Sequence, residues 1–474
     1  MLYKEINREY NKGIMWKRAI HRKHGTQLLE TYSADFYCSD IKATLKKRLE
    51  DAGVPIQEKT DEELCNVMLP RESEQEKLFV RRIATFITLM KSSCKSIQTV
   101  LLRAKEAGDQ RSAFIIQYIF QPAYECYTEI LNEKHRLDFT DLIWQATEIC
   151  RTRRPVEYDY IIVDEFQDIS RDCYNFLQAL KEGNNPPAKL YCVGDDWQSI
   201  YRFSGSDITF FSRFADYFGP TEVNKLETTY RFGEPLLSLS SHFVQRNQVQ
   251  IDKKIRPSNF DAKTQLEFHA YNRHDYCDMI NGLIFVIPSN RSVLLLGRYS
   301  FDDYYLSCRY KMIKEGSRFY YLIAGRKIEF LTIHKSKGLE ADYVILLQCN
   351  KDIYGFPSLV SDDPVLNYAM SAVDQFLYGE ERRLFYVAIT RAKVKTIVLY
   401  DKRCPSVFVD EFLRPEEAAE EQKAEHSNAD RRWTRAAERF LLKLYGEGNS
   451  LQYIATKMGR SRASIAMRLR KLSG

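Results

Sequence analysis

The sequence predicts an α/β protein in which parallel sheets are covered by helices on both faces. Between about residues 150 and 410, short apolar runs such as "YDYIIVDE", "KLYCVGDD" and "YVILLQ" alternate with helical segments. Continuous apolar strands separated by helices are typical of a parallel sheet buried on both sides. The length of 474 residues, 44% of them hydrophobic, is enough for two or three domains with cores of their own.

Changes in composition divide the chain into five regions. Residues 1–150 are expected to be mainly helical, with apolar residues at helical spacing in "SEQEKLFVRRIATFITLMKSSCKSI". Residues 151–235 and 236–412 each carry strands enough for one sheet. Residues 413–432 are charged and almost without core-forming side chains, which predicts a linker or solvated helix. Residues 433–474 are expected to form a small helical unit.

Composition narrows the class of protein. The net charge of +6 is compatible with a nucleic-acid partner, although such a surplus often only solvates a surface. The 11 cysteines include no CxxC pair, so neither a disulfide framework nor a zinc site is expected. The first residues are too charged for a signal peptide, and no apolar run approaches the roughly 18 residues of a membrane span. We expect a soluble cytoplasmic protein.

The stretch "YDYIIVDEFQDIS", residues 158–170, places acids directly after an apolar strand. Ligands of α/β sheets bind beyond the carboxyl ends of the strands. Asp164 can hold Mg²⁺, a hard cation that prefers oxygen ligands and is usually shared with substrate phosphates. Glu165 can orient and deprotonate a water that attacks a phosphoryl group. The alternative is a solvated turn, since acids are common where helices begin.

Polar residues also follow a second apolar strand, in "LYCVGDDWQSIYRFSGSDI". The carboxamide of Gln198 stands close behind Asp195 and Asp196, where it can sense a phosphate or water across a cleft. Aromatic residues interleaved with an arginine could stack on bases while the arginine meets a phosphate. Taken singly, aromatic residues more often belong to a core. The interleaved residues are Trp197, Tyr201, Arg202 and Phe203.

Three later segments offer candidate cations. "LETTYRF" contains Arg231, and "EERRLFYVAITRAK" places Arg391 and Lys393 on an expected helix. A transferring γ-phosphate requires fixed arginines because its charge must be neutralised in the transition state. A lone arginine is usually a surface residue, but Arg231 and Arg391 each close a polar cluster beside an apolar run. The third segment, "LTIHKSKGLEADYVILL", carries His334, Lys335, Ser336, Lys337 and Gly338 between two strands.

Taken together, five segments resemble motifs of superfamily 1 DNA helicases of the UvrD/Rep type. In order, they are "VDEFQD", "VGDDWQSIYRFSGS", "LETTYRF", "TIHKSKGLEADYVIL" and "EERRLFYVAITRAK". The earlier "LDFTDLI" resembles a further family segment, so the likeness spans roughly residues 137–400. The opening "KRAIHRKHGTQLLETYS" and the C-terminal unit are most similar to the helicase IV branch.

This resemblance implies two RecA-like domains with ATP and Mg²⁺ between them and single-stranded DNA across their top. It also implies 3′-to-5′ translocation and a place in DNA repair. By family position, Asp164 is similar to the Mg²⁺ ligand, Glu165 to the catalytic base, and Gln198 to the glutamine that links the γ-phosphate to DNA. The other implied positions are Arg231 and Arg391 at the γ-phosphate, Gly338 and Glu340 near the ribose and DNA backbone, and Phe203, Tyr201, Arg202, His334 and Lys335 toward DNA.

No string of the form G-x-x-x-x-G-K-[ST] occurs in the sequence. Such a loop is a nest of backbone amides with a lysine on the β- and γ-phosphates. In the family it precedes all the segments quoted above. The chain is therefore expected to begin inside the helical insertion of an incomplete first domain, as a C-terminal portion, a split gene product or a degenerate relative. We expect an exposed apolar sheet edge and impaired ATP hydrolysis, and a separate fragment that supplies the loop is an expected partner.

The final segment, "SLQYIATKMGRSRASIAMRLRKL", resembles a helix-turn-helix. From Tyr453 onward it has six basic residues and no acid, which favours contact with a DNA backbone. The predicted contacts include Arg460, Arg462 and Arg468, with Arg462 and Ser464 toward bases. The alternative is a small protein-docking module. The expected core consists of Phe440, Leu441, Leu444, Ile454, Ala455, Met458, Ile465 and Leu469.

Two functions therefore compete at the level of the sequence. The first is an ATP-dependent DNA helicase or its C-terminal portion. The second is a non-catalytic DNA-binding or regulatory protein that keeps the helicase shape without the motor. A third and less specific possibility is a structural protein that docks on a partner through its C-terminal unit. For such a protein, salt should have little effect on DNA binding.

Overall fold

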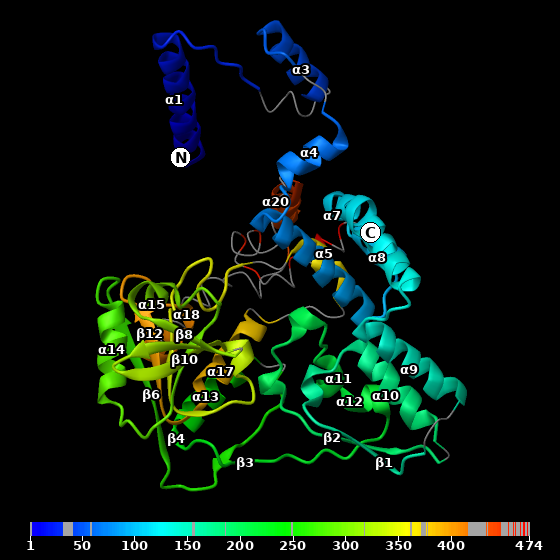
Figure 1. Cartoon of the computed structure of the whole chain (residues 1–474), viewed down its shortest axis with the longest axis vertical. Helices are drawn as coiled ribbons and strands as arrows, with labels where there is room; N and C mark the ends of the chain where they lie inside the picture. The colour runs from blue at the N-terminus through cyan, green and yellow to red at the C-terminus, as the bar shows by residue number, and fades with distance from the viewer. Residues whose placement is uncertain are drawn as a thin grey trace. The chain divides into compact units, whose positions relative to one another are not determined.

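The computed structural model confirms the α/β class and divides the chain into two compact units, Met1–Arg81 and Arg82–Gly474 (Figure 1). In the first unit, α4 begins with a capping box in which the Thr60 hydroxyl accepts from the backbone of Glu63 and the Glu63 carboxylate accepts in return. None of the residues 13–31, 41–56 and 59–81 of the first unit is buried. Its helices are α1 (Leu2–Lys23), α3 (Ile41–Asp51) and α4 (Asp61–Met68). The structure describes residues 2–31, 41–56, 59–153, 157–184, 186–247, 250–316, 318–360, 363–370, 376, 378–415, 433, 435–446, 454, 458, 460, 465, 468, 469 and 472.

A helical region precedes the first sheet, as the composition predicts. Phe86 and Phe120 pack at its centre with ring centroids 4.4 Å apart. Lys91 joins two of its helices because its ammonium binds Asp138 at 2.5 Å and Asp141 at 2.6 Å. The helices are α5 (Glu74–Ser92), α6 (Ile97–Glu106), α7 (Gln110–Ile115), α8 (Gln121–Glu133) and α9 (Phe139–Arg153), with a π-helical turn at Ile116–Phe120.

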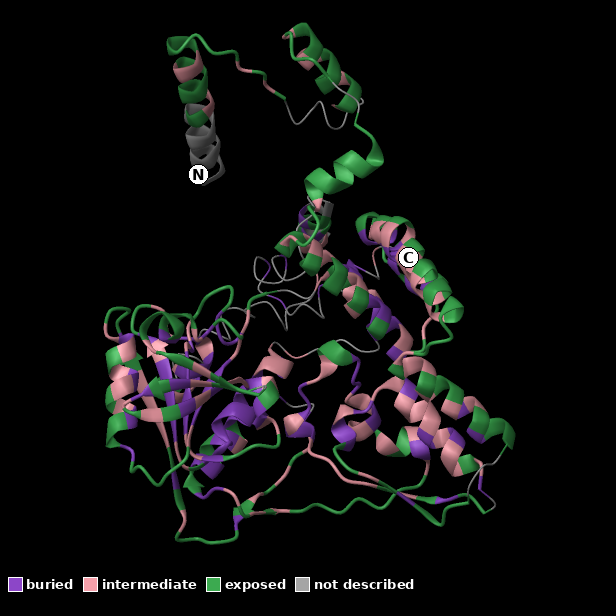
Figure 2. Cartoon of the chain, viewed as in Figure 1, coloured by how far each residue is buried: buried purple, intermediate pink, exposed green. Residues whose placement is uncertain are grey.

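The sheet that carries the first acids has two parallel strands among the described residues, β1 (Tyr160–Val163) and β2 (Lys189–Cys192). Helix α10 (Arg171–Glu182) and the short helices α11 (Thr209–Ser212) and α12 (Phe214–Phe218) follow these strands. More than half of the surface of several apolar side chains on these strands is exposed (Figure 2), whereas parallel sheets are normally covered on both faces. These side chains are Tyr160, Ile162 and Tyr191.

The second sheet has eight strands in the order β4-β6-β12-β11-β7-β10-β9-β8. From β4 to β10 all neighbours are parallel, and β9 and β8 extend the sheet as an antiparallel hairpin. A separate pair joins β3 (Thr228–Thr229) to β5 (Arg256–Pro257). The strands are β4 (Glu234–Pro235), β6 (Lys263–Tyr271), β7 (Val293–Gly297), β8 (Met312–Glu315), β9 (Arg318–Ile323), β10 (Arg326–Thr332), β11 (Ala341–Leu346) and β12 (Ala392–Asp401).

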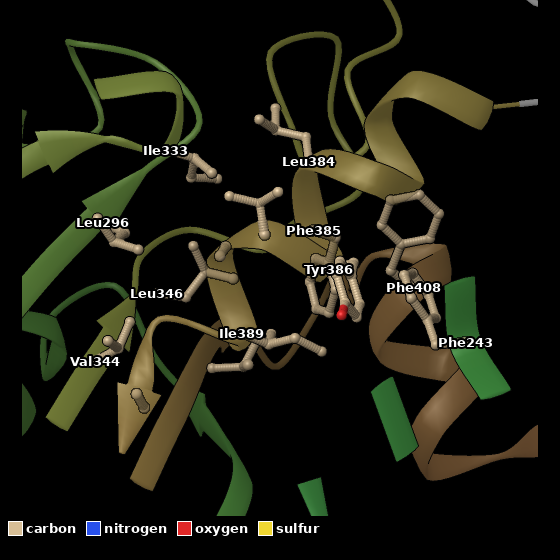
Figure 3. Packing of buried hydrophobic residues seen from close by; sticks show 14 of the residues in the cluster. Phe243, Leu296, Ile333, Val344, Leu346, Leu384, Phe385, Tyr386, Ile389 and Phe408 are labelled. Carbon is tan, nitrogen blue, oxygen red and sulfur yellow. The ribbon is translucent and has the colours of Figure 1, made fainter. Parts of the chain in front are cut away.

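Apolar clusters cover both faces of this sheet. On β7, Leu294 and Leu296 pack into a cluster with α13 and α17, while Leu295 packs on the other face with α14 (Figures 1 and 3). This alternation explains why the strand is a continuous apolar run in the sequence. The helices around the sheet are α13 (Leu236–Gln245), α14 (Tyr276–Val286), α15 (Tyr304–Arg309), α17 (Gly379–Ile389) and α18 (Val407–Leu413), whereas α16 (Pro364–Ala369) packs on the helical region with α6 and α7.

The C-terminal unit contains α20 (Arg435–Gly446) and a small core. The prediction for Phe440 is wrong, because this ring is 45% exposed. Ala455 and the charged stretch 416–432 lie outside the described residues. No helix in the described part of the chain is long and apolar enough to cross a membrane. Six predicted core residues are buried together, namely Leu441, Leu444, Ile454, Met458, Ile465 and Leu469.

Candidate functional site

Asp164 and Glu165 are exposed at the carboxyl end of β1. Glu165 has a left-handed backbone with φ of 50°, a conformation that costs energy for a residue with a side chain. Two hydrogen bonds hold this turn. The Glu165 amide donates to Asp164 Oδ1 at 2.8 Å, and the buried Gln167 amide donates to Glu165 Oε2 at 2.6 Å. The turn thus aims both carboxylates away from the strand.

Gln167 also fixes the neighbouring loop after β2. Its Oε1 accepts from the Asp195 amide at 2.9 Å. Gly194 permits this contact, because a Cβ at that position would lie 2.5 Å from Gln167 Oε1 and 2.8 Å from the Phe211 ring. The glycine of "VGDD" is therefore explained by the close approach of the two loops.

Gln198 joins the two sheet-bearing lobes. Its amide donates to Asp195 Oδ2 at 2.7 Å, and its Oε1 accepts from Arg391 Nη2 at 3.1 Å. Arg391 lies on the turn between α17 and β12 and Lys393 lies within β12, so the helix predicted to carry both is wrong. The helix ends early because the chain enters the central strand β12, and Thr390 caps the turn by donating to Tyr386 O at 2.7 Å.

Arg391 is almost completely buried and its guanidinium is held by three acceptors. Besides Gln198, it donates to Val387 O at 3.0 Å and Leu339 O at 3.3 Å. Burial lowers the pKa of Arg391 to about 10, and the nearby charge of Arg231 contributes. The group is still a cation at neutral pH, and it is positioned before any ligand binds.

Lys337, one of the residues named in "LTIHKSKGLEADYVILL", is a central residue of the site. Its ammonium contacts Asp168, lies 3.4 Å from Glu165 Oε2 and donates to Gln198 O at 3.0 Å. It also lies 5.1 Å from the centre of the Tyr201 ring. Burial raises the pKa of Asp168 even though the ammonium of Lys337 opposes that shift. Lys337 stood in a quoted segment, but only the fold shows which lysine turns inward.

An open pocket of ≈ 530 Å³ lies beside Gln198. Arg231 lines it and binds Glu340 at 3.3 Å, and Lys393 contacts the same carboxylate. The hydrogen bond from Lys393 lowers the pKa of Glu340, and Arg231 adds to that effect. Gly338, with φ of 81°, ends the turn that leads to Glu340. The lining residues are Asp195, Gln198, Leu226, Thr228, Thr229, Tyr230, Arg231, Phe232, Ile255, Glu340, Tyr386, Thr390 and Lys393.

Lys253 is a residue of the site that sequence reasoning missed. Its ammonium binds Asp195 at 2.6 Å and Asp196 at 2.5 Å and lies 5.0 Å from the Trp197 ring. Trp197 is fully buried and donates to Ile251 O at 3.1 Å, so it belongs to the core. The acids after β2 are therefore partly neutralised from within the protein. No spacing in "QIDKKIRP" could have shown this pairing.

The predicted DNA face brings several aromatic groups together. Phe203 is half-exposed, and its ring centre lies 5.1 Å from the His334 ring, edge to face. Tyr201 donates to His334 O at 3.0 Å, while Arg202 is held by Glu380 at 3.0 Å. This ion pair directs the Arg202 guanidinium into the protein. A second pocket of ≈ 290 Å³ is lined by Phe203, Arg298, His334, Glu380, Glu381 and Leu384.

Other predicted DNA contacts are placed separately. Lys335 is exposed beside His334. In the C-terminal unit, Arg460 is buried with its guanidinium 4.1 Å from the Trp433 ring, and Arg468 contacts Glu438. Both arginines thus make contacts inside their own unit. Arg462 and Ser464 lie outside the described residues.

Burial, together with the positive charge of Arg298, lowers the pKa of His334 to about 4. An unfolded histidine titrates near 6.5, so the unfolded state binds more protons between pH 6.5 and 4 and stability falls as pH falls. Between pH 7.5 and 4.5, we expect the free energy of unfolding of His334→Asn to fall by about 2 kcal/mol less than that of wild type. Urea unfolding from pH 7.5 to 4.5 measures it, with the exposed His274→Asn as control. Parallel pH profiles for wild type and His334→Asn would contradict the assignment.

Comparisons with known proteins agree with this arrangement. The UvrD/REP helicase N-terminal domain model matches residues 4–219, and the UvrD-like helicase C-terminal domain model matches residues 311–403. DNA helicase IV of Escherichia coli is 34% identical over 62% of this chain and 41% of its own length. A putative ATP-dependent DNA helicase, YjcD of Bacillus subtilis, is 29% identical over 33% of this chain and 21% of its own length. DNA helicase II of E. coli is 28% identical over 34% of this chain and 23% of its own length.

The two matched domain models, over residues 4–219 and 311–403, place the chain in the UvrD/REP helicase class. The chain belongs to the UvrD/Rep-type helicase family. It spans less than half the length of the curated relatives described above.

Proposed function

We propose that this chain is the motor part of an ATP-dependent 3′-to-5′ DNA helicase of the cytoplasm, and that it hydrolyses ATP slowly on its own. The observation that supports this proposal most directly is the pair of contacts of Gln198. Its side chain binds Asp195, in the loop after β2 of the first sheet, and Arg391, which precedes β12 of the second sheet. The direction of translocation and the place in DNA repair come from the family resemblance. The slow rate follows from the lack of a phosphate-binding loop motif in these residues.

In this proposal the side chains divide the chemistry between them. Glu165 accepts the proton of the attacking water, and Gln167 and Lys337 hold its carboxylate in place. Arg391 and Arg231 neutralise the charge that develops on the γ-phosphate. By family position, Glu340, which lines the larger pocket, and Gly338 would lie near the ribose.

The residues present also fit Mg²⁺, which would neutralise phosphate charge when it is bound. Asp164 is an exposed carboxylate, and Mg²⁺ is usually held by one or two carboxylates together with waters and substrate phosphates. The part of the chain that the structure describes contains no cluster of three or more His, Cys, Asp or Glu side chains that could hold a metal ion.

A connected set of contacts links the nucleotide pocket to the proposed DNA face. Gln198 O accepts from Lys337, the Lys337 ammonium lies over the Tyr201 ring, and Tyr201 holds the His334 carbonyl. Phe203 stands on the outer side of His334. A base stacked on Phe203 would therefore be sensed at Gln198 through four contacts, which gives DNA a route to stimulate hydrolysis.

Glu165→Gln tests the proposal because it preserves size and hydrogen bonding while removing the base. We expect the single-turnover rate of ATP hydrolysis with Mg²⁺ and single-stranded DNA to fall by about 10²- to 10⁴-fold. DNA affinity should be unchanged, and it should weaken steeply as salt rises. Glu182→Gln, the same change at an exposed position on α10, is the control.

The outcomes separate the candidate functions. DNA binding without any hydrolysis by the wild-type chain would favour the non-catalytic DNA-binding protein, for which the missing loop motif is the supporting observation. Binding that is insensitive to salt would favour a structural docking role. Hydrolysis that survives in Glu165→Gln would contradict the assignment of the base.

A further inference from the structure

Aromatic side chains follow three neighbouring strands of the large sheet. Strands β10, β7 and β11 are adjacent and parallel, so their carboxyl ends meet at one edge. His334 follows β10, Tyr299 and Phe301 follow β7, and Tyr354 lies in the loop after β11. Ligands of α/β sheets bind beyond this edge. The Phe203–His334 site accounts for the aromatic residue after β10 and leaves those after β7 and β11 without a role.

Tyr299, Phe301 and Tyr354 form one surface, the aromatic ledge. Tyr299 and Phe301 are stacked with ring centres 4.9 Å apart and planes at 7°. Tyr354 meets both edge to face, at 5.8 Å from Tyr299 and 5.6 Å from Phe301. Phe301 is 50% exposed and Tyr354 is 59% exposed. The ledge therefore offers ring surface to solvent, unlike a packed core.

Hydrogen bonds and an ion pair fix the position of the Tyr299 side chain in the ledge. Tyr299 shares a hydrogen bond of 2.5 Å with the Ser358 hydroxyl, and the Ser358 amide donates to Glu381 at 3.0 Å. The same Glu381 binds Arg298 through both of its oxygens. A rigid aromatic surface loses little conformational entropy when a flat ligand stacks on it.

Arg298 connects the ledge to the Phe203 site. Its guanidinium carbon lies 4.7 Å from the centre of the Tyr299 ring, and the residue also lines the pocket with Phe203 and His334. Lys335 and Lys351 are exposed on the loops of the same sheet edge, where Asp352 is also exposed. Aromatic rings with cations beside them suit a strand of stacked bases and its phosphates.

We propose that the aromatic ledge is a second base-stacking site for single-stranded DNA, continuous with the Phe203 site across Arg298. The inference rests on the proposed function, because it takes the Phe203 site as the first contact. A single strand that leaves Phe203 passes Arg298 and stacks further bases on Phe301 and Tyr354. The ledge lengthens the bound segment without a contact to the nucleotide pocket.

Oligonucleotides with one abasic position moved along the strand test the ledge. With wild type, affinity should fall about tenfold at two separate sets of positions, since stacking of one base contributes about 1–3 kcal/mol. Phe301→Ala with Tyr354→Ala should abolish the dependence at one set, and Phe203→Ala at the other. The single variant Tyr354→Trp, which keeps an aromatic ring at this position, should retain the loss of affinity at the abasic positions that depend on the ledge. Tyr304→Ala, an exposed aromatic residue of α15 outside the ledge, is the matched control.

Each outcome has a separate meaning. Suppose Phe203→Ala abolishes the effect of abasic sites at one set of positions while the ledge variants leave every position unchanged. The ledge is then not a DNA site, and the proposed function stands. If the ledge variants and Phe203→Ala act on the same positions, a separate site is also contradicted. If Phe203→Ala leaves all binding unchanged, the proposed DNA face itself is wrong. Circular dichroism melting checks that each variant folds.

Discussion

Replacing Arg391 with alanine is expected to slow single-turnover ATP hydrolysis by about 10³-fold or more, the loss typical of a missing transition-state arginine. The guanidinium is already fixed by Gln198, Val387 and Leu339, so it needs no rearrangement to meet a γ-phosphate. Preorganised charge of this kind stabilises a transition state more than a mobile side chain can. The measurement is hydrolysis of radiolabelled ATP with enzyme in excess over nucleotide.

Two further variants make the Arg391 result specific. Arg391→Lys keeps the charge, but its single nitrogen cannot span three acceptors that the guanidinium reaches from three separate nitrogens, so we expect most of the loss to remain. Arg318→Ala, at an exposed arginine on β9, should have no effect. Because the alanine variant leaves buried acceptors without a donor, thermal melting must show that it is folded at the assay temperature. A folded Arg391→Ala variant with wild-type hydrolysis would contradict the assignment.

Replacing Arg382 with alanine is expected to lower the free energy of unfolding by about 3 kcal/mol, the loss typical of a broken buried ion pair. Its guanidinium forms a bidentate pair with Glu411, with both distances 2.7 Å, and donates to Phe243 O at 3.1 Å. The two side chains are 3% and 2% exposed. Without Arg382 the buried carboxylate keeps only part of its compensation, from Arg246 at 2.9 Å.

Urea unfolding measures the Arg382 effect. Arg151→Ala removes an exposed pair with Glu148 and is expected to change stability by less than about 0.5 kcal/mol. Arg382 joins α17 to α18, so its loss should also increase amide exchange at the end of α18. Equal stability of the Arg382 and Arg151 variants would show that the buried pair contributes little.

Much of the fold follows from local sequence pattern. The runs around Leu295 and Val344 are strands because a sheet covered on both faces buries every residue of an apolar run. The order of the strands and the antiparallel hairpin of β8 and β9 could not be read in this way, because pairing depends on contacts between distant segments. The prediction that Arg391 lies on a helix was wrong for a related reason. The helical sequence pattern continues past Ile389, where α17 ends, because β12 begins at Ala392.

The candidate site was predictable in its motifs and unpredictable in its pairings. The family resemblance implied that Gln198 and Arg391 reach one site from two domains, and the structure brings them to 3.1 Å. It could not show that Arg202 binds Glu380 or that Lys337 lies under Tyr201, since lysines and arginines in one segment have equivalent patterns. Burial and partner choice are decided by the packing of α17 against the loops after β2 and β10.

The most direct measurement of the central claim is ATP hydrolysis with single-stranded DNA by Glu165→Gln, Arg391→Ala and the double variant, all compared with wild type. If the two residues act on one phosphoryl transfer from opposite sheets, each single variant is near background and the double variant is little slower. Wild-type rates in either folded single variant, with DNA binding intact, would contradict a shared site between these two residues.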